Sequence, residues 1–526
     1  MLRIYFTIIL FFVFSEGTTQ VTFVDQTSYG GSDFDSPSSI VEAPGGGYYV
    51  LNYSRSGNSG NMTVSNFGEI DYVLVKYDDN HTIEWQKEYG GTQNDVPTDL
   101  YLIDSTLFMM GTSNSSVSGN KTVDTLGAHD IWVVKTDLDG NVIWDKVFGG
   151  EKTDLYQAST KLDNGSLLVG SQSYSGATGN KTSPNLGAGD FWMFEMDQNG
   201  DYVWEKTLGT DEMDVLTDIV TFQGDIFISG SSQGGINGDK TEPLYGLGDY
   251  WVVKTDAAGN KIWDRAMGTT GPDIVSSHLY VSADSIQVYN NGNNTMSGMR
   301  SIPRKGSHDI WNVNLNHNGE VTSQRAYGGN QREGVGGVYS TNEGLLLISS
   351  SNSDVSLDKT EDSRGARDFW PILLDQSGNL VWQKTIGGNE RDIFGEYLLR
   401  QNGNLLLVGS SQSPFSGDKV VTNYGDSDTW IVELDITELS TQTESEEFFS
   451  VFPNPFEEKI VLRGEYMSEI RLIEMVDARG KVVYSTRDTH ELSGGQFSIS
   501  TRKFSQGAYI LNVFTATDKH SFKVLK

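Results

Sequence analysis

Acidic residues recur along this chain every 59 or 60 residues, and they are the first candidates for chemistry. If the strands that they open surround a channel, seven carboxylates at its mouth could bind a cation or a polyhydroxylated ligand. Aspartates in such places also cap neighbouring backbone amides, and we expect capping to be their main role. The candidate ring follows paired glycines or their equivalents and consists of Asp35, Asp95, Asp154, Asp214, Asp273, Glu333 and Asp392.

A second acidic set is the aspartate of an Asp-x-Trp motif, with a degenerate copy at Asp71. A basic residue stands nine positions before it in six repeats. These matched charges predict one ion pair or hydrogen-bond clamp per repeat, because a buried carboxylate without a partner is costly. The motif residues are Asp130 and Trp132, Asp190 and Trp192, Asp249 and Trp251, Asp309 and Trp311, Asp368 and Trp370, and Asp428 and Trp430. The basic residues are Lys121, Lys181, Lys240, Arg300, Lys359 and Lys419.

A third acidic set lies seven residues after the second, in predicted hairpin turns. Its segment 137–141 resembles half a calcium loop. The other repeats do not keep the ligand positions, and the acidic twelfth residue is missing, so Asx-type turns explain the set better. We expect no metal and no cofactor, with Ca²⁺ as the alternative.

Catalysis has little support in the sequence. The seven histidines share no repeat position and form no metal-ligand spacing, and no nucleophile elbow, phosphate loop or dinucleotide fingerprint stands in a convincing context. Glycosidic hydrolysis needs only two well-placed carboxylates, so an enzyme stays open. A repeated position is a poor candidate for it, because symmetry makes seven copies where chemistry needs one asymmetric set.

The elements that position these residues are short strands. One repeat contains apolar runs at 98–103, 106–111, 130–136 and 142–148, separated by turn residues, which predicts a four-stranded antiparallel sheet. All eleven tryptophans fall in two repeat positions, so we expect them in the packing between sheets.

Seven repeats at a fixed long period predict a ring of similar units. The last repeat stops at Asp435 without a fourth strand, and residues 21–31 align with the fourth-strand segment 81–91. We therefore predict an all-β fold, a seven-bladed β-propeller of four-stranded blades whose N-terminal strand closes the last blade and leaves no sheet edge.

Composition narrows the class of partner. The net charge of −32 disfavours nucleic acid and anionic membrane surfaces. There is no cysteine, which excludes disulfides and thiolate metal sites. Residues 1–17 read as a signal peptide, and we expect no transmembrane segment.

The repeat gives way to an acidic linker at 436–449, and a new strand pattern fills 450–526. We assign residues 18–435 to the propeller and expect a small β-sandwich in the tail. The marked features of the tail are Pro453, Asn454 and Pro455, the hairpin residues Asp477 and Gly480, the strand start at Gly507 and Tyr509, and the final Lys526.

Because of these residues and their order, the tail resembles the type A C-terminal sorting domain of the type IX secretion system of Bacteroidetes. The resemblance implies the secretion machinery as a partner and export across the outer membrane. It further implies removal of the tail, with release or attachment at the cell surface. The repeat region resembles uncharacterised propellers that are found with such tails, which implies a fold and not an activity.

We expect a secreted or surface-displayed, non-catalytic binding or adhesion module for a glycan or a protein. The alternative is a secreted polysaccharide-active enzyme of glycoside hydrolase type on a propeller scaffold. The fifth repeat departs most from the pattern, at Arg300, Asn316, Ser323 and Glu333, so an asymmetric function is expected nearby.

Overall fold

The computed structural model describes residues 21–273, 277–292, 296–341 and 344–436 of the repeat region, and 449–452, 456–464, 470–477, 481–487, 496–515 and 519–526 of the tail. The predicted signal peptide, residues 437–448 of the predicted linker, Pro453, Asn454, Pro455 and Gly480 lie outside these described residues. Two compact units are present, one within Gln20–Thr437 and the other within Glu438–Lys526.

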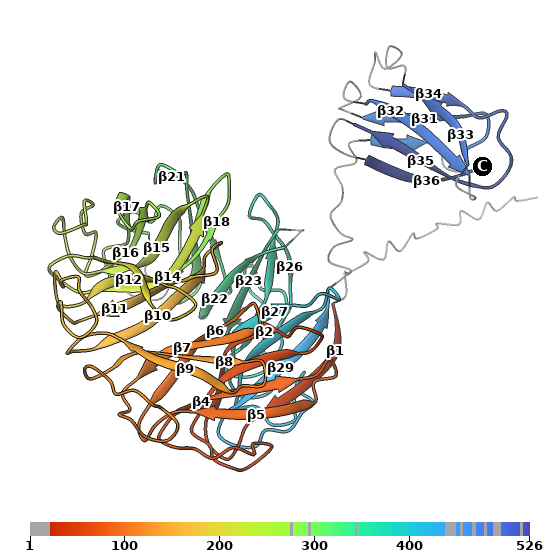
Figure 1. Cartoon of the computed structure of the whole chain (residues 1–526). Coiled ribbons are helices and arrows are strands. Elements are labelled where there is room, and N and C mark those ends of the chain that lie inside the picture. Colours follow the sequence, from red (N-terminus) through yellow and green to blue (C-terminus); the bar gives the residue numbers. More distant parts are fainter. Residues whose placement is uncertain are drawn as a thin grey trace, which may run out of the picture. The chain divides into compact units, whose positions relative to one another are not determined.

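The repeat unit contains seven antiparallel sheets, and each sheet is one blade (Figure 1). In blades 1 to 5 four consecutive strands pair in chain order. Blades 1 and 2 are β2 (Asp35–Glu42), β3 (Tyr48–Ser54), β4 (Asp71–Tyr77) and β5 (Ile83–Tyr89), then β6 (Asp95–Ile103), β7 (Thr106–Ser113), β8 (Asp130–Asp137) and β9 (Val142–Phe148). Blades 3 and 4 are β10 (Asp154–Lys161), β11 (Leu167–Ser173), β12 (Asp190–Met196) and β13 (Tyr202–Leu208), then β14 (Asp214–Phe222), β15 (Asp225–Ser232), β16 (Asp249–Thr255) and β17 (Lys261–Met267). Blade 5 is β18 (Ser277–Val281), β19 (Ile286–Gly292), β20 (Asp309–Leu315) and β21 (Val321–Tyr327).

The last two blades depart from this order. In blade 6 the third strand is split into two pieces on either side of Pro371, which has no N–H to donate. Its strands are β22 (Glu333–Ser340), β23 (Leu345–Ser351), β24 (Asp368–Phe369), β25 (Ile372–Leu374) and β26 (Leu380–Gln383). Blade 7 takes its fourth strand from the start of the described chain, and its strands are β27 (Asp392–Leu399), β28 (Leu405–Ser411), β29 (Asp428–Asp435) and β1 (Thr22–Tyr29).

The ring is closed. The first strand of each blade contacts the first strands of the two blades beside it, and β27 of the last blade contacts β2 of the first. The first strands therefore surround a central channel, and the predicted propeller and its closing strand are confirmed. The apolar core lies between neighbouring blades: one cluster joins Leu51 and Leu74 of blade 1 to Leu107, Met109 and Trp132 of blade 2.

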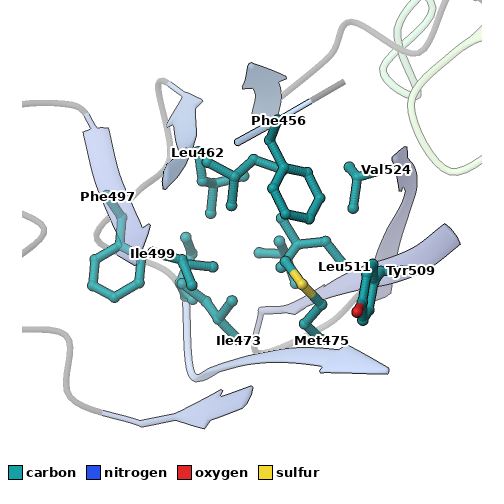
Figure 2. Close-up of a cluster of buried hydrophobic side chains, with 12 residues drawn as sticks. Phe456, Leu462, Ile473, Met475, Phe497, Ile499, Tyr509, Leu511 and Val524 are labelled. Atoms are coloured by element: carbon teal, nitrogen blue, oxygen red, sulfur yellow. The ribbon is translucent and has the colours of Figure 1, made fainter. Parts of the chain in front are cut away.

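The tail unit is built from two sheets, ordered β30-β31-β34 and β33-β32-β35-β36. Side chains from both sheets meet in one buried cluster that includes Leu462, Met475, Phe497 and Leu511 (Figure 2). Two sheets packed over a shared core form the small sandwich that the sequence predicts. The strands are β30 (Phe449–Phe452), β31 (Lys459–Gly464), β32 (Leu472–Asp477), β33 (Val482–Thr486), β34 (Gln496–Ser500), β35 (Ala508–Phe514) and β36 (Lys519–Leu525).

Candidate functional site

Six of the seven carboxylates of the candidate ring open first strands, and Asp273 lies four residues before Ser277, where β18 begins; all seven are buried, with exposed fractions of 0–1%. In blade 2 the Asp95 carboxylate accepts hydrogen bonds from the Gly91 N–H at 2.7 Å and the Ser115 hydroxyl at 2.8 Å. Glu333 accepts from the Ser351 hydroxyl at 2.8 Å in the same way. Hydrogen bonds of this kind are expected if the carboxylates cap neighbouring groups of the chain and do not bind a ligand. A binding role for the ring stays a prediction, and a ligand would need to displace them.

The Asp-x-Trp aspartates lie beside this ring. Asp130 Oδ2 accepts the Leu126 N–H at 2.6 Å and the Gly127 N–H at 2.9 Å. Its Oδ1 lies so close to Gly149 that a Cβ at that glycine would collide with it. Burial raises the pKa of Asp130 to about 6, and the charge of Asp154 adds to the rise. Two buried carboxylates thus meet at this junction of two blades, on either side of a glycine that no larger residue can replace.

The basic residues make two kinds of contact, and only the one with the motif aspartate is the predicted clamp. In blade 5 Arg300 makes a bidentate ion pair with Asp309, at 3.0 and 2.6 Å. In other blades a lysine donates to a carbonyl and lies over the motif tryptophan. Lys181 Nζ is 2.7 Å from the Ser175 carbonyl oxygen and 5.7 Å from the centre of the Trp192 ring. These residues therefore hold the framework together and are not available to a ligand.

The six motif tryptophans are buried, and each donates its indole N–H to a polar side chain thirteen residues later or, in blade 7, to Gln26. Sequence reasoning missed this acceptor position, because its residue type changes from blade to blade. The only feature of the sequence that marks the acceptor is its position, directly after the second of the two repeat positions that hold tryptophan. The acceptors are Asp145, Glu205, Asp264, Gln324, Gln383 and Gln26.

Inside the channel, the residues at equivalent positions differ from blade to blade. Six of the first strands carry a β-bulge two to four residues after the opening acid. A bulge redirects the side chain that follows it, and here that position holds a different residue in almost every blade. Three of them are acidic, Asp99, Asp218 and Glu396, and sequence reasoning missed all three.

These acids share the channel with tyrosines from other blades. Tyr156 donates its hydroxyl to Asp99, and the Ser159 hydroxyl donates to the same carboxylate at 3.0 Å. Burial raises the pKa of Glu396 to about 8, and the charge of Asp99 adds to the rise. Side chains of blades 2 and 7 therefore interact across the channel.

The long loops between the second and third strands of the blades lie at the end of the ring where the first strands begin. His129 at the end of one loop pairs with Thr153, directly before β10. Five of these loops expose an apolar side chain at one fixed position, four residues before the basic residue. We call these residues the apolar ring, and their exposed fractions are 55–71%: Val117, Ile236, Met296, Val355 and Phe415.

The predicted calcium-like turns are closed by their own side chains. Asp137 accepts the Asp139 N–H at 3.0 Å and the Asn141 N–H at 2.8 Å, which is an Asx turn. In the described part of the chain, no group of three or more His, Asp or Glu side chains is arranged to hold a metal ion. Among those same residues, no helix is long and apolar enough to cross a membrane.

Comparison with known proteins identifies the tail. Residues 450–526 match the model of the secretion system C-terminal sorting domain. Within it Asp477 accepts the Lys481 N–H at 3.0 Å, and Gly507 and Lys526 exchange backbone hydrogen bonds. The tail is a type IX sorting domain, so the chain is a propeller protein destined for the outer surface or the extracellular medium.

The solved structures similar to this chain include propellers. The WD40 propeller domain of Doa1 is 10% identical, with a TM-score of 0.41, and the match covers 79% of this chain and 97% of that one. The Pan2 WD40 domain of Neurospora crassa is 10% identical at 0.41, over 77% and 89%. A protein of unknown function from Bacteroides caccae is 13% identical at 0.34, over 60% and 89%. No curated protein matches the chain.

Proposed function

We propose that the propeller is a non-catalytic binding or adhesion module that holds a glycan or a protein outside the cell against its loop-bearing face. The observation that carries this proposal is the apolar ring. Loops of soluble proteins are normally polar, and large apolar groups repeated on one face are typical of interaction surfaces.

The surroundings of the ring support this reading. A second apolar position, four residues before the Asp-x-Trp aspartate, is 36–46% exposed on the same loops in five blades. The residues at that position are Phe67, Leu126, Leu186, Tyr245 and Tyr424. The framework residues beneath are committed to hydrogen bonds within and between blades. The loops can therefore vary without loss of the fold, which suits a binding surface.

The test is capture of ligands by the full chain on a glycan array and on a panel of extracellular proteins. Replacing Ile236 and Phe415 by serine should weaken a captured ligand at least about tenfold, a change of about 1.4 kcal/mol. The matched control replaces Ile143 and Val203, which are 53% and 57% exposed on outermost strands. Equal loss in both variants, or no ligand on either panel, would contradict the proposal.

The enzymatic alternative would use the channel. Glu396 and Asp99 are two buried carboxyl groups of the channel whose pKa values burial raises, that of Glu396 to about 8, and glycoside hydrolysis needs two carboxyl groups of which one is protonated. Incubation with a panel of polysaccharides and measurement of reducing ends decides between the two functions. Turnover that Glu396→Gln abolishes, while the melting temperature is kept, would replace the binding proposal by hydrolysis.

A further inference from the structure

Four basic or imidazole side chains lie together at the channel mouth of a chain whose net charge is −32. The residue before each Asp-x-Trp aspartate pairs in parallel with the residue before the next opening acid. In blades 1 to 4 and at the closing junction these pairs hold no lysine or arginine, and their one imidazole is that of His129, which pairs with Thr153. The remaining two pairs are His308 with Arg332 and Arg367 with Arg391, and we call these four residues the cationic arc.

The arginines of the arc have no acid of their own. In the described part of the chain, Arg332, Arg367 and Arg391 form no ion pair, and the buried Nε of Arg367 has no hydrogen-bond partner. Burial lowers the pKa of Arg367 to about 10, and the charges of Arg332 and Arg391 add to the fall, while Glu333 opposes it. A guanidinium held half-buried among like charges lacks a counter-charge.

The buried acids nearest to the arc accept hydrogen bonds within the chain or pair with Arg300, although Glu333 Oε2 and Asp392 Oδ1 have no hydrogen-bond partner among the described residues. Asp309 is bound by Arg300, and the Glu333 carboxylate accepts the hydroxyls of Ser351 and Ser353. Asp392 accepts the Gly388 N–H at 2.6 Å and the Ser413 hydroxyl at 2.9 Å. No ion pair within the described residues neutralises the arginines of the arc, so an anionic group of a ligand would supply a counter-charge there.

The first strand of blade 6 leaves room for a ligand next to the arc. A Cβ at Gly334 would lie 2.8 Å from Arg367 Nη2, so this glycine allows the guanidinium to rest against the strand. Gly336 is exposed, and a Cβ there would meet only ordinary contacts at 3.6 and 3.7 Å. The backbone is thus open where the mouth leads into the channel.

The channel beyond is lined by acidic residues. Asp99, Asp218 and Glu396 follow the bulges of their strands, and Tyr339 and Tyr397 have ring centres 3.5 Å apart. A dense polyanion would be repelled by those of these carboxyl groups that are ionised, since burial raises the pKa of Asp218 only to about 6, while it raises that of Glu396 to about 8. A ligand with one anionic group and a neutral, hydroxyl-rich body satisfies both regions, since hydroxyls donate well to carboxylates and sugar rings stack on aromatic faces.

We propose that the cationic arc binds the carboxylate or sulfate group of an acidic sugar in a glycan, whose neutral part enters the channel mouth. This inference rests on the proposed binding function and narrows it to one ligand class at one part of the loop-bearing face. Arginine suits the task because its planar fork matches a carboxylate or a sulfate with two parallel hydrogen bonds.

The experiment measures binding of the full chain by calorimetry to trigalacturonate, to a sulfated galactose oligosaccharide, to a neutral galactose oligosaccharide and to poly-L-glutamate. We expect one or both acidic sugars to bind, with affinity falling as salt rises, and the neutral sugar to bind at least about tenfold more weakly. The two acidic arms distinguish carboxylate from sulfate as the recognised group.

Two variants assign the binding to the arc. Arg332→Gln with Arg391→Gln should weaken the acidic sugar at least about tenfold, and Gly334→Ala, which displaces Arg367, should weaken it without removing a charge. The matched control is Lys161→Gln, at the other end of a first strand, which should stay within about twofold of the parent chain.

Three other outcomes would each contradict the inference for a different reason. Tighter binding of poly-L-glutamate than of either sugar would make the partner an acidic protein. If none of the anionic ligands binds, while a ligand of the apolar ring is still captured, the cationic arc is not a binding site. The proposed function then stands. Loss of all capture on this face would refute both.

Discussion

At the scale of single residues, the motif tryptophans join the blades. Trp251 is fully buried, its ring centre lies 5.0 Å from that of Phe191 in the preceding blade, and it donates to Asp264 at 3.1 Å. Trp251→Ala should lower the free energy of unfolding by about 3–5 kcal/mol. The matched control in the same blade is Ile262→Ala, at a side chain 53% exposed, which should cost under about 0.5 kcal/mol. A loss below about 1 kcal/mol for Trp251→Ala in denaturant titration would contradict its place in the core.

Buried carboxylates set a pH dependence of stability. Burial raises the pKa of Asp130, Asp214, Asp249 and Asp428 to about 6, against about 3.9 in an unfolded chain. The folded state therefore binds more protons than the unfolded state between about pH 4 and 6. Their stabilising contribution is complete below about pH 4 and is lost as the pH rises through 6.

We expect the melting temperature to be higher at pH 5 than at pH 7.5. Asp130→Asn should make the curve flatter, because one of the titrating groups is gone. Asp137→Asn is the matched control, since Asp137 is only half-buried and hydrogen bonds from Asn141 lower the pKa of its carboxyl. Stability that rises from pH 5 to pH 7.5 would show that these carboxyls are ionised throughout.

Residue roles were predictable from the sequence where they are periodic. The burial of the motif tryptophans follows from their repetition, because a framework needs the same packing group in every blade. The acceptor of the indole N–H alternates between Asp, Glu and Gln, so no residue type marks it. The arginines of the cationic arc were missed because they depart from the repeat, and one sequence does not separate a departure with a role from ordinary variation.

At the scale of elements, β1 is the strand that closes the ring. It pairs with β29 from Thr22 opposite Asp435 to Tyr29 opposite Thr429. Gln26 supplies the indole acceptor of blade 7, accepts the Val420 N–H at 3.2 Å and donates to the Asp418 carbonyl at 2.7 Å. An N-terminal segment thus makes the contacts that an outermost strand makes in the other blades.

Gln26→Ala should destabilise the propeller by about 1–3 kcal/mol, because the buried N–H of Trp430 loses its acceptor. Val24→Ala, at a neighbouring side chain 51% exposed, should cost under about 0.5 kcal/mol. Removal of residues 21–29 should open the edge of β29 and cause aggregation on heating. Thermal melting with light scattering tests all three, and a truncated chain that melts like the parent would exclude closure through β1.

The number of blades, the four strands in each and the closing strand were all predictable, because seven copies of one pattern reinforce each other. Two details of the elements were not. The split of the third strand of blade 6 depends on Pro371, whose effect on hydrogen bonding shows only once the strand is placed in its sheet. The bulges follow residues as different as Pro97, Tyr156 and Phe394, so they have no signature in residue type.

At the scale of the whole molecule, the sorting domain and the propeller have separate cores and separate tasks. One buried cluster includes Leu462, Met475 and Leu511 of the tail, and the propeller clusters are drawn from its own blades. We therefore expect the propeller to fold without residues 450–526. The tail directs the chain to the outer surface or the medium, and the blades form the propeller that is carried there.

Deletion of residues 450–526 should therefore change location and leave the fold intact. We expect the shortened chain to remain inside the outer membrane of an expressing cell with a type IX system, while the parent chain reaches the surface or the medium. The melting temperature of the purified propeller should stay within about 2 °C of the same transition in the full chain, because no core residue has been lost. Fractionation with immunoblotting measures the first effect and calorimetry the second. The control is Lys161→Gln in the full chain, which alters one surface charge of a blade and should be exported normally. Export of the shortened chain would remove the sorting role of the tail, and a large fall in the melting temperature would show that the two units fold as one.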